Sequence, residues 1–300
     1  MPPPPPTPNI EPYLLSPSHH LSIFTTVILP AELAPHEHHT RPPSRRPLAV
    51  LILGQTGAGK TRLAPALLAA MPATPHPPVH LVADTYKTYH PHHGVCLAAA
   101  SADARRWLAV ACAWVADRGC DVLVESACRF PGDFVGLVEV FEGAGYVVKV
   151  AVLAVGEGLS RLGILKRFWG GLEEGRGRLT PRGVHDESYR GLGEVVGWLD
   201  ARRVGGKGGG VVVVRRGGGV VYRGEGGVAG ALEGERRRGL TGRERAVAEG
   251  DMQGLRGLGE GRVDGEVEEI RGLLEGLGTV EGGELEGGGL EEFIREGLEV

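Results

Sequence analysis

The stretch VLILGQTGAGKT contains glycine, lysine and threonine at a spacing suited to holding a phosphate. It fits the pattern G-x-x-x-x-G-K-[ST], in which the glycines let backbone N–H groups close around a β-phosphate. In this pattern the lysine bridges the β- and γ-phosphates, and the threonine hydroxyl binds Mg²⁺. We therefore predict a site for ATP or GTP, with Thr61 as a metal ligand, that consists of Gly54, Gln55, Thr56, Gly57, Ala58, Gly59, Lys60 and Thr61.

Acidic residues follow the next strand-like segments, where an α/β sheet binds its ligands. Asp84, the last residue of VHLVAD, is placed either to accept a proton from a substrate hydroxyl or to cap the following helix. The next strand is expected to end at Glu125, within DVLVES, and Arg129 stands four residues later. From their types alone, Glu125 and Arg129 form either part of a substrate pocket or an ordinary surface ion pair.

Two arginines further along, Arg167 in LGILKRFW and Arg178 in GRGRLTPRG, are candidates for stabilising a phosphoryl group in transfer. Arginines supplied from a lid in the same chain are a recurrent means of neutralising charge on the equatorial oxygens. The alternative is that both arginines are solvated, as most arginines in such charged segments are.

The elements that must position these residues alternate along the chain. The continuous apolar run from Leu48 to Leu53 predicts a parallel strand buried on both faces, and the following helix pattern contains Pro65, which we expect to kink it. Further strands at VHLVAD, DVLVES and YVVKVAVLAV alternate with helices, one of which we expect Asp103 to open. This order predicts the α/β class: a P-loop NTPase-type parallel sheet with helices on both faces and a helical lid.

Composition divides the chain further, because most of its 21 prolines precede Val50 and most of its 50 glycines follow Gly156. The segment VVVVRRGGGVVYRG predicts a hairpin, and Thr241 and Glu244 have capping-box spacing at the start of a later helix. The predicted divisions are a disordered Pro tract (1–8), a helical extension (9–34), a linker (35–47), the kinase domain (48–224) and a partly disordered Gly/Glu-rich helical tail (225–300).

Taken in order, GQTGAGKT, ADTYKTYHP, VESACR, LSRLGILKRF and GRLTPRGVHDESYRGL resemble the zeta toxin family of P-loop kinases, which phosphorylate UDP-N-acetylglucosamine. The resemblance runs from about Leu48 to Tyr222. It implies an ATP- and Mg²⁺-dependent phosphotransferase whose acceptor is a hydroxyl of a sugar nucleotide. It also implies a possible antitoxin-like partner, of which the sequence itself carries no signature.

The resemblance assigns roles to individual residues. Asp84 matches the family's catalytic aspartate, and Arg167 and Arg178 match arginines directed at the transferring phosphate. Glu125 and Arg129 match residues of the sugar-nucleotide pocket, and His90, in the D-T-x-x-x-x-H-P motif, is a further candidate for substrate binding. Thr180, Pro181, His185 and Asp186 resemble residues that shape the lid.

Departures from the family pattern keep other functions open. Val82 stands where the family often has a further acid, and Ser126 and Ala127 replace Gly-Thr. One alternative is a kinase for another small molecule or for a polynucleotide end. The other is a nucleotide-binding module without catalysis that works through partners.

The formal net charge of −4, with acidic and basic residues intermixed, argues against partners such as nucleic acid or a membrane surface. The four cysteines form no C-x-x-C pair, which favours reduced thiols. The chain shows no secretory signal pattern and no apolar run long enough to span a bilayer. We therefore expect a cytoplasmic protein.

Overall fold

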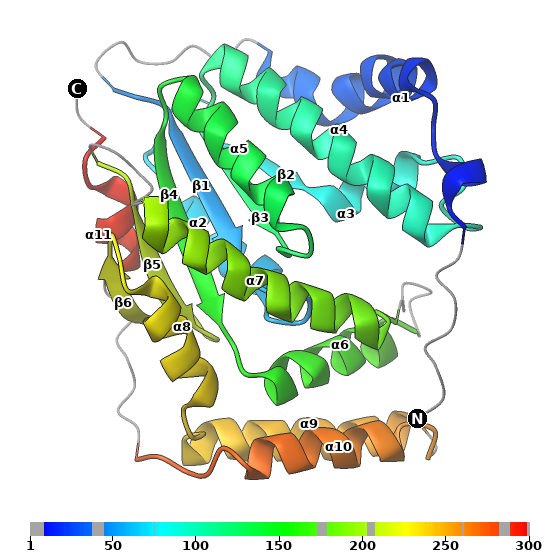
Figure 1. Cartoon of the computed structure of the whole chain (residues 1–300), viewed down its shortest axis with the longest axis vertical. Helices are drawn as coiled ribbons and strands as arrows, with labels where there is room; N and C mark the ends of the chain where they lie inside the picture. Colours follow the sequence, from blue (N-terminus) through cyan, green and yellow to red (C-terminus); the bar gives the residue numbers. More distant parts are fainter. Residues whose placement is uncertain are drawn as a thin grey trace.

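The fold is organised around one sheet with helices on both faces (Figure 1). The computed structural model describes residues 9–37, 45–74, 76–172, 179–202, 208–259, 261–281 and 289–298. Arg178 lies outside the described residues, as do the Pro tract 1–8 and most of the linker after Glu37.

Within the described residues, six strands form the sheet in the order β2-β3-β1-β4-β5-β6. They are β1 (Leu48–Leu53), β2 (Val79–Val82), β3 (Val122–Ser126), β4 (Val147–Ala154), β5 (Gly210–Arg215) and β6 (Val220–Gly224). The first five are parallel, and β6 returns antiparallel to β5. The α/β class, the parallel sheet and the hairpin predicted from the sequence are therefore confirmed.

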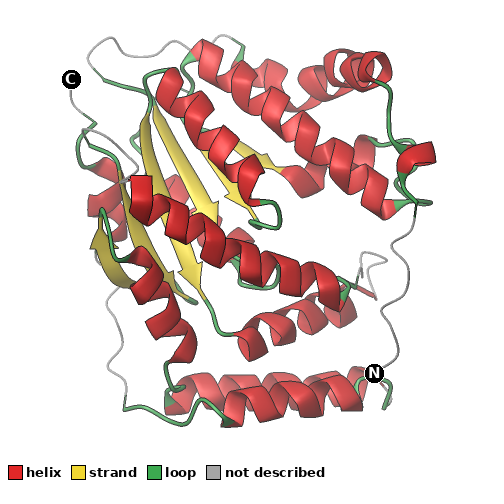
Figure 2. Ribbon diagram, in the orientation of Figure 1, coloured by secondary structure: helices red, strands yellow, loops and turns green. Residues whose placement is uncertain are grey.

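Each strand divides its side chains between two cores, because successive residues point to opposite faces. Ala49, Leu51 and Leu53 of β1 pack into one core, and Leu48, Val50 and Ile52 pack into the other. The first core is covered by α4 (Leu97–Arg118), α5 (Pro131–Gly143), α7 (Arg182–Arg202) and α8 (Val228–Arg237), and the second by α2 (Lys60–Ala70) and α11 (Leu290–Arg295). Figure 2 shows this layered arrangement, with the strands between the helices.

A third apolar cluster lies beyond the carboxyl ends of the central strands, toward which the arrowheads of β1 and β4 point in Figure 1. It is formed by α6 (Glu157–Leu172), α9 (Gly242–Gly259) and α10 (Asp264–Glu275). The predicted capping box at the start of α9 is confirmed: the Thr241 N–H donates to Glu244 Oε2 at 2.8 Å, and the Glu244 N–H donates to Thr241 Oγ1 at 3.2 Å.

The N-terminal residues form short helical segments that pack on α4: η1 (Glu11–Tyr13), α1 (Pro17–Ile23), the π-helical η2 (Phe24–Leu33) and η3 (Ala34–His36). The indole of Trp107 donates to the carbonyl of His20 at 2.9 Å, and the two rings stack. The expectation that Asp103 opens a helix is wrong, because α4 begins at Leu97 and Asp103 is buried within it. There the Asp103 carboxylate accepts the N–H of Leu15 at 2.9 Å, which ties the N-terminal segments to the domain.

The residues after Gly224 contribute to the same fold. α8 inserts Val228 and Leu232 into the first core, and α11 inserts Phe293 and Ile294 into the second. α2 runs as one helix through Pro65. Among the described residues, no helix is both long and apolar enough to cross a membrane.

Candidate active site

The loop between β1 and α2 depends on two glycines in the left-handed region. Gly57 has a φ of 83° and Gly59 a φ of 106°, which residues with a side chain rarely adopt. A Cβ on Gly57 would also lie 2.0 Å from the carbonyl oxygen of Ser160 in α6. Both the conformation of the loop and its close contact with α6 therefore require glycine.

Lys60 opens α2, and its ammonium turns back to the loop. Its Nζ donates to the carbonyl of Gly54 at 2.7 Å and to that of Gln55 at 3.4 Å. The two carbonyls accept hydrogen bonds that the ammonium could also donate to a phosphate. The lysine is thus already directed into the loop that is predicted to hold the phosphates.

Charged groups from other elements influence the buried ammonium of Lys60. Burial lowers the pKa of this ammonium, while Glu125, Cys128 and Asp84 act to raise that pKa and the guanidinium of Arg167 lowers it further. A direct contact joins two of these elements, because Thr61, next to Lys60, donates to the Glu125 carboxylate. An anionic phosphate would relieve the burial cost of Lys60 and the repulsion from Arg167.

Glu125 is the next-to-last residue of β3, the strand beside β1, and its buried carboxylate faces the start of α2. Thr61 Oγ1 donates to Glu125 Oε2 at 3.1 Å, and His80 Nε2 lies 3.1 Å from Glu125 Oε1. A hydroxyl and a carboxylate oxygen are the donor types that suit Mg²⁺, which keeps waters and binds through few protein ligands together with phosphates. The residues present therefore fit a magnesium ion beside the loop.

Asp84 lies directly after β2, in the first turn of the short helix α3 (Ala83–Tyr86), which is followed by η4 (Lys87–Tyr89). Its carboxylate forms an ion pair with Lys87, and its side chain is 60% exposed. The N-cap position of α3 is occupied by Val82, with no side-chain capping bond. Of the two interpretations left open by the sequence, Asp84 therefore does not act as the N-cap.

Arg167 lies on the face of α6 that packs on the phosphate-binding loop. Ser160, Gly163 and Ile164 belong to the same face, since residues three and four apart are neighbours on a helix. A Cβ on Gly163 would lie 2.5 Å from the carbonyl oxygen of Gly57, and Ile164 meets the same glycine. The Arg167 guanidinium donates to Thr180 Oγ1 at 2.8 Å, which links α6 to the segment before α7.

Arg129 and Glu125 do not pair with each other. Arg129 forms an ion pair with Glu187 of α7, and its guanidinium lies 5.1 Å from the ring centre of Phe130. Arg129 therefore lies at the protein surface, between the carboxylate of Glu187 and the partly exposed ring of Phe130.

His90 lies in the interior. Its side chain has no exposed surface, its Nε2 is 3.1 Å from Asp103 Oδ2, and its Nδ1 accepts the N–H of His92 at 3.1 Å. Burial lowers the pKa of His90, with Asp103 opposing that effect. The placement gives no support to the prediction that His90 binds substrate, because both ring nitrogens are engaged, one with Asp103 and the other with the N–H of His92.

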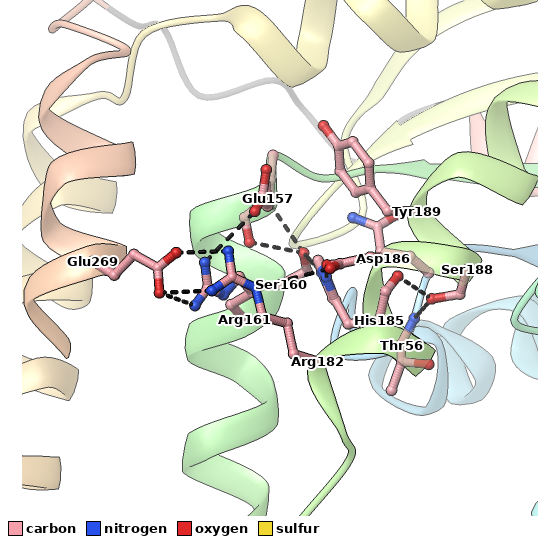
Figure 3. Close-up of polar contacts among 12 residues, drawn as sticks. Thr56, Glu157, Ser160, Arg161, Arg182, His185, Asp186, Ser188, Tyr189 and Glu269 are labelled. Atoms are coloured by element: carbon pink, nitrogen blue, oxygen red, sulfur yellow. Dashed lines mark hydrogen bonds and ion pairs between the residues drawn. The ribbon is translucent and has the colours of Figure 1, made fainter. Parts of the chain in front are cut away.

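A polar network that the sequence did not indicate connects the phosphate-binding loop to α6 and α7 (Figure 3). The N–H of Thr56 donates to Ser188 Oγ at 3.1 Å, and that hydroxyl donates to the carbonyl of His185 at 2.8 Å. His185 Nε2 lies 2.9 Å from Ser160 Oγ. The only sequence signal was the H-D-E-S run itself, in which His185 was interpreted as shaping the lid.

The same network reaches the C-terminal helices. In Figure 3, Glu269 of α10 meets Arg161 of α6 and Arg182 of α7. The two guanidinium groups lower the pKa of the Glu269 carboxyl to about 2. α10 is thereby joined to both helices that contact the phosphate-binding loop.

Arg236 of α8 is a second residue that the sequence did not indicate. Its side chain is buried, donates to the carbonyl of Tyr189 at 3.0 Å, and stacks 3.7 Å from the centre of that ring. Its Nη2 also lies 3.5 Å from Gln55 Oε1, and Gln55 Nε2 donates to the carbonyl of Val155 at 2.6 Å. The second residue of the loop is therefore positioned by β4 on one side and by α8 on the other.

The turn after β3 lies against α7. Cys128 has a φ of 56° there, the left-handed region that residues other than glycine seldom occupy, and its N–H donates to Ser126 Oγ at 3.2 Å. A Cβ on Gly191 would lie 2.1 Å from the Cys128 carbonyl oxygen, so α7 presses on the turn. Strained backbone of this kind persists where the surroundings over-determine it, as at ligand sites.

The arrangement is that of a P-loop protein of the kinase type. A glycine-rich loop connects a strand of a parallel sheet to a helix that begins with lysine and threonine, and the adjacent strand carries a carboxylate near its end. A sequence profile of the zeta toxin family matches residues 33–226, well over half of the chain. The chain belongs to the zeta toxin family. It matches none of the curated proteins.

One of the similar solved structures has the same fold. A chain from the PezAT chromosomal toxin–antitoxin system of Streptococcus pneumoniae superposes with a TM-score of 0.67 at 18% identity, covering 80% of this chain and 96% of that one. A chain from the AvrRxo1-ORF1:AvrRxo1-ORF2 complex with sulphate ions is similar at 14% identity with a TM-score of 0.45, covering 83% of this chain and 81% of that one. The similarity to the PezAT chain shows that this protein has the same fold as that chain.

Proposed function

We propose that this protein is an ATP-dependent kinase that transfers the γ-phosphate to a hydroxyl of UDP-N-acetylglucosamine or a related sugar nucleotide. The observation that carries the proposal is the phosphate-binding loop into which Lys60 Nζ is directed, with Thr61 at the start of α2 bonded to the buried carboxylate of Glu125 on the neighbouring strand. Asp84, after β2, and Arg167, on the helix that packs on the loop, are the further groups that a kinase needs beside a nucleotide site.

In the proposed reaction Asp84 accepts the proton of the acceptor hydroxyl. The acceptor oxygen forms a bond to the γ-phosphorus while the bond from that phosphorus to the β–γ bridging oxygen breaks, and ADP leaves. Lys60 and Arg167 stabilise the negative charge on the transferring group. Arg178 remains a second candidate for that role. Thr61 and Glu125 would hold Mg²⁺, which when bound neutralises charge on the phosphates.

The acceptor side is bounded by residues from several elements. Asp84 follows β2, Glu125 lies near the end of β3, and Arg129 follows the strained turn at Cys128. We propose that Arg129, next to the partly exposed Phe130, contacts the diphosphate or base of the sugar nucleotide, with Glu187 as its partner in the absence of acceptor. The family membership supports this acceptor class, and the described toxin–antitoxin neighbour supports an antitoxin-like protein partner.

A panel of acceptors tests the proposal. Purified protein is incubated with γ-labelled ATP, Mg²⁺ and, in separate reactions, UDP-N-acetylglucosamine, other UDP-sugars, free nucleosides and a 5′-hydroxyl oligonucleotide. Label in a UDP-sugar fraction that is lost in Asp84→Asn supports the proposal. Label in a nucleoside or oligonucleotide alone would replace the acceptor class, and ATP binding without transfer to any acceptor would favour a catalytically silent nucleotide-binding module.

A further inference from the structure

The Glu125 carboxylate is held at both oxygens by residues from two different elements. Oε2 accepts from Thr61 Oγ1 at 3.1 Å, and Oε1 lies 3.1 Å from His80 Nε2. The Glu125 side chain is 3% exposed, whereas that of His80 is 31% exposed. A chain of contacts therefore runs from the first turn of α2, through a buried carboxylate, to a half-exposed imidazole.

The strand register explains how His80 reaches this carboxylate. His80 of β2 pairs with Leu123 of β3, and Glu125 stands two residues further along the same face. Leu123 packs into the core beneath α2, whereas Val79 and Leu81 of β2 pack into the opposite core. His80 therefore shares the α2 face with Glu125, and its imidazole lies diagonally across the strand pair from the carboxylate.

A carboxylate that is hydrogen-bonded at only one oxygen can rotate about its terminal C–C bond. It can then turn either oxygen toward a neighbouring group. A ring N–H donated to Oε1 leaves Oε2 as the oxygen that faces Thr61, the predicted metal ligand. Partners of this kind, which bind a ligating side chain rather than the metal, orient that side chain and typically affect metal affinity 10- to 100-fold. His80, which is partly exposed, differs in this from His90, whose side chain is fully buried beside Asp103.

We propose that His80 is a positioning residue that orients Glu125 toward a divalent cation shared with Thr61 and the nucleotide phosphates. The inference rests on the proposed function, since it presupposes that Thr61 and Glu125 hold Mg²⁺. It adds a residue outside the phosphate-binding loop and outside the D-T-x-x-x-x-H-P motif. His80 acts through Glu125 and does not itself bind the metal.

The test measures Mn²⁺ binding to the full-length protein in the presence of ADP by electron paramagnetic resonance, which reports free Mn²⁺ without any catalysis. His80→Val removes the imidazole but retains a good strand former, and His80→Gln retains an N–H donor near the position of Nε2. His19→Val, at an exposed histidine of α1, is the control. We expect His80→Val to weaken Mn²⁺ binding about 10-fold or more, with His80→Gln restoring much of it and His19→Val unchanged.

ADP affinity without metal and the thermal unfolding midpoint are measured for each variant. Metal-free ADP affinity should stay at the wild-type level in His80→Val, and the unfolding midpoint should fall only slightly, because the imidazole is partly exposed and its hydrogen bond is to Glu125. Equal Mn²⁺ affinity in wild type and His80→Val would overturn the role of His80 while leaving the kinase proposal intact. If the wild-type protein binds no Mn²⁺ with ADP, the metal-dependent kinase proposal itself fails, and the role of His80 fails with it.

Discussion

Ser188 Oγ accepts the backbone N–H of Thr56 at 3.1 Å, so a helix 132 residues further along the chain holds the phosphate-binding loop. The same hydroxyl donates to the carbonyl of His185 in α7. The loop is thus positioned by the lid-side helices before any nucleotide is present. Pre-positioning of this kind lowers the ordering cost of binding.

Replacing Ser188 with alanine tests this relationship. The change leaves the part-buried N–H of Thr56 without its acceptor, which costs about 1–3 kcal/mol. We expect weaker binding of ADP and a lower free energy of unfolding in Ser188→Ala, with Ser188→Thr close to wild type. Fluorescent-nucleotide titration and urea unfolding provide the two measurements, and an unchanged ADP affinity would mean that the loop is held by other contacts.

Replacing Asp84 with asparagine tests the general base. Because a base acts in the transition state, we expect kcat to fall by about 10²- to 10⁴-fold while ATP affinity stays the same. Asp117→Asn, at an exposed aspartate of α4, serves as the matched control. Steady-state kinetics at saturating acceptor provide the measurement. Full activity in Asp84→Asn would assign the proton transfer to another group.

Arg167 is tested by its substitution with glutamine. Losing a donor that acts on the transferring phosphate typically costs about 10²- to 10³-fold in turnover. We expect that loss in Arg167→Gln, with little change in ADP binding because ADP lacks the γ-phosphate. Arg237→Gln removes an arginine that is 80% exposed on α8 and should retain full turnover. A loss confined to ADP affinity would show that Arg167 serves nucleotide binding instead.

Because Lys149 is buried, we expect the free energy of unfolding to depend on pH. This residue of β4 is fully buried beneath α11, its Nζ lies 4.7 Å from the ring centre of Phe293, and it has no hydrogen-bond partner among the described residues. Burial lowers its pKa from 10.5 to about 8, with the charge of Glu296 opposing that effect. The unfolded chain therefore holds more protons than the folded one between these values, and stability should rise as the pH increases from about 8 to 10.5.

Lys149→Met should remove this dependence, and it should raise the free energy of unfolding at pH 7, where the charged form is buried. Urea unfolding across this pH range is the measurement. Lys166→Met, at a lysine paired with Asp251 on the surface, should keep the wild-type pH profile. A destabilised Lys149→Met protein with an unchanged profile would show that the ammonium is well accommodated.

The sequence predicted the sheet and the loop because their signals are local. The apolar run of β1, the glycine spacing and the capping box at Thr241 each depend on a few adjacent residues. α8 was missed because its glycines weaken the helix pattern, and Val228 and Leu232 stabilise it only by packing on the sheet.

The site was less predictable wherever contacts join distant segments. His90 shares a motif with Asp84, yet the structure buries it beside Asp103 of α4, a contact that no local spacing predicts. Ser188 and Arg236 reach the loop from helices far along the chain, and no spacing rule connects them to it. The roles of Asp84, Glu125, Arg129, Arg167 and Arg178 in catalysis and binding stay predictions.

The most direct measurement is a crystal structure of the full-length protein with a non-hydrolysable ATP analogue, Mg²⁺ and UDP-N-acetylglucosamine. The account predicts that an acceptor hydroxyl lies within hydrogen-bond distance of Asp84 and in line with the γ-phosphate, with Arg167 and Lys60 on the oxygens of that phosphate. A γ-phosphate directed away from Asp84, or a sugar nucleotide bound elsewhere on the protein, would contradict it.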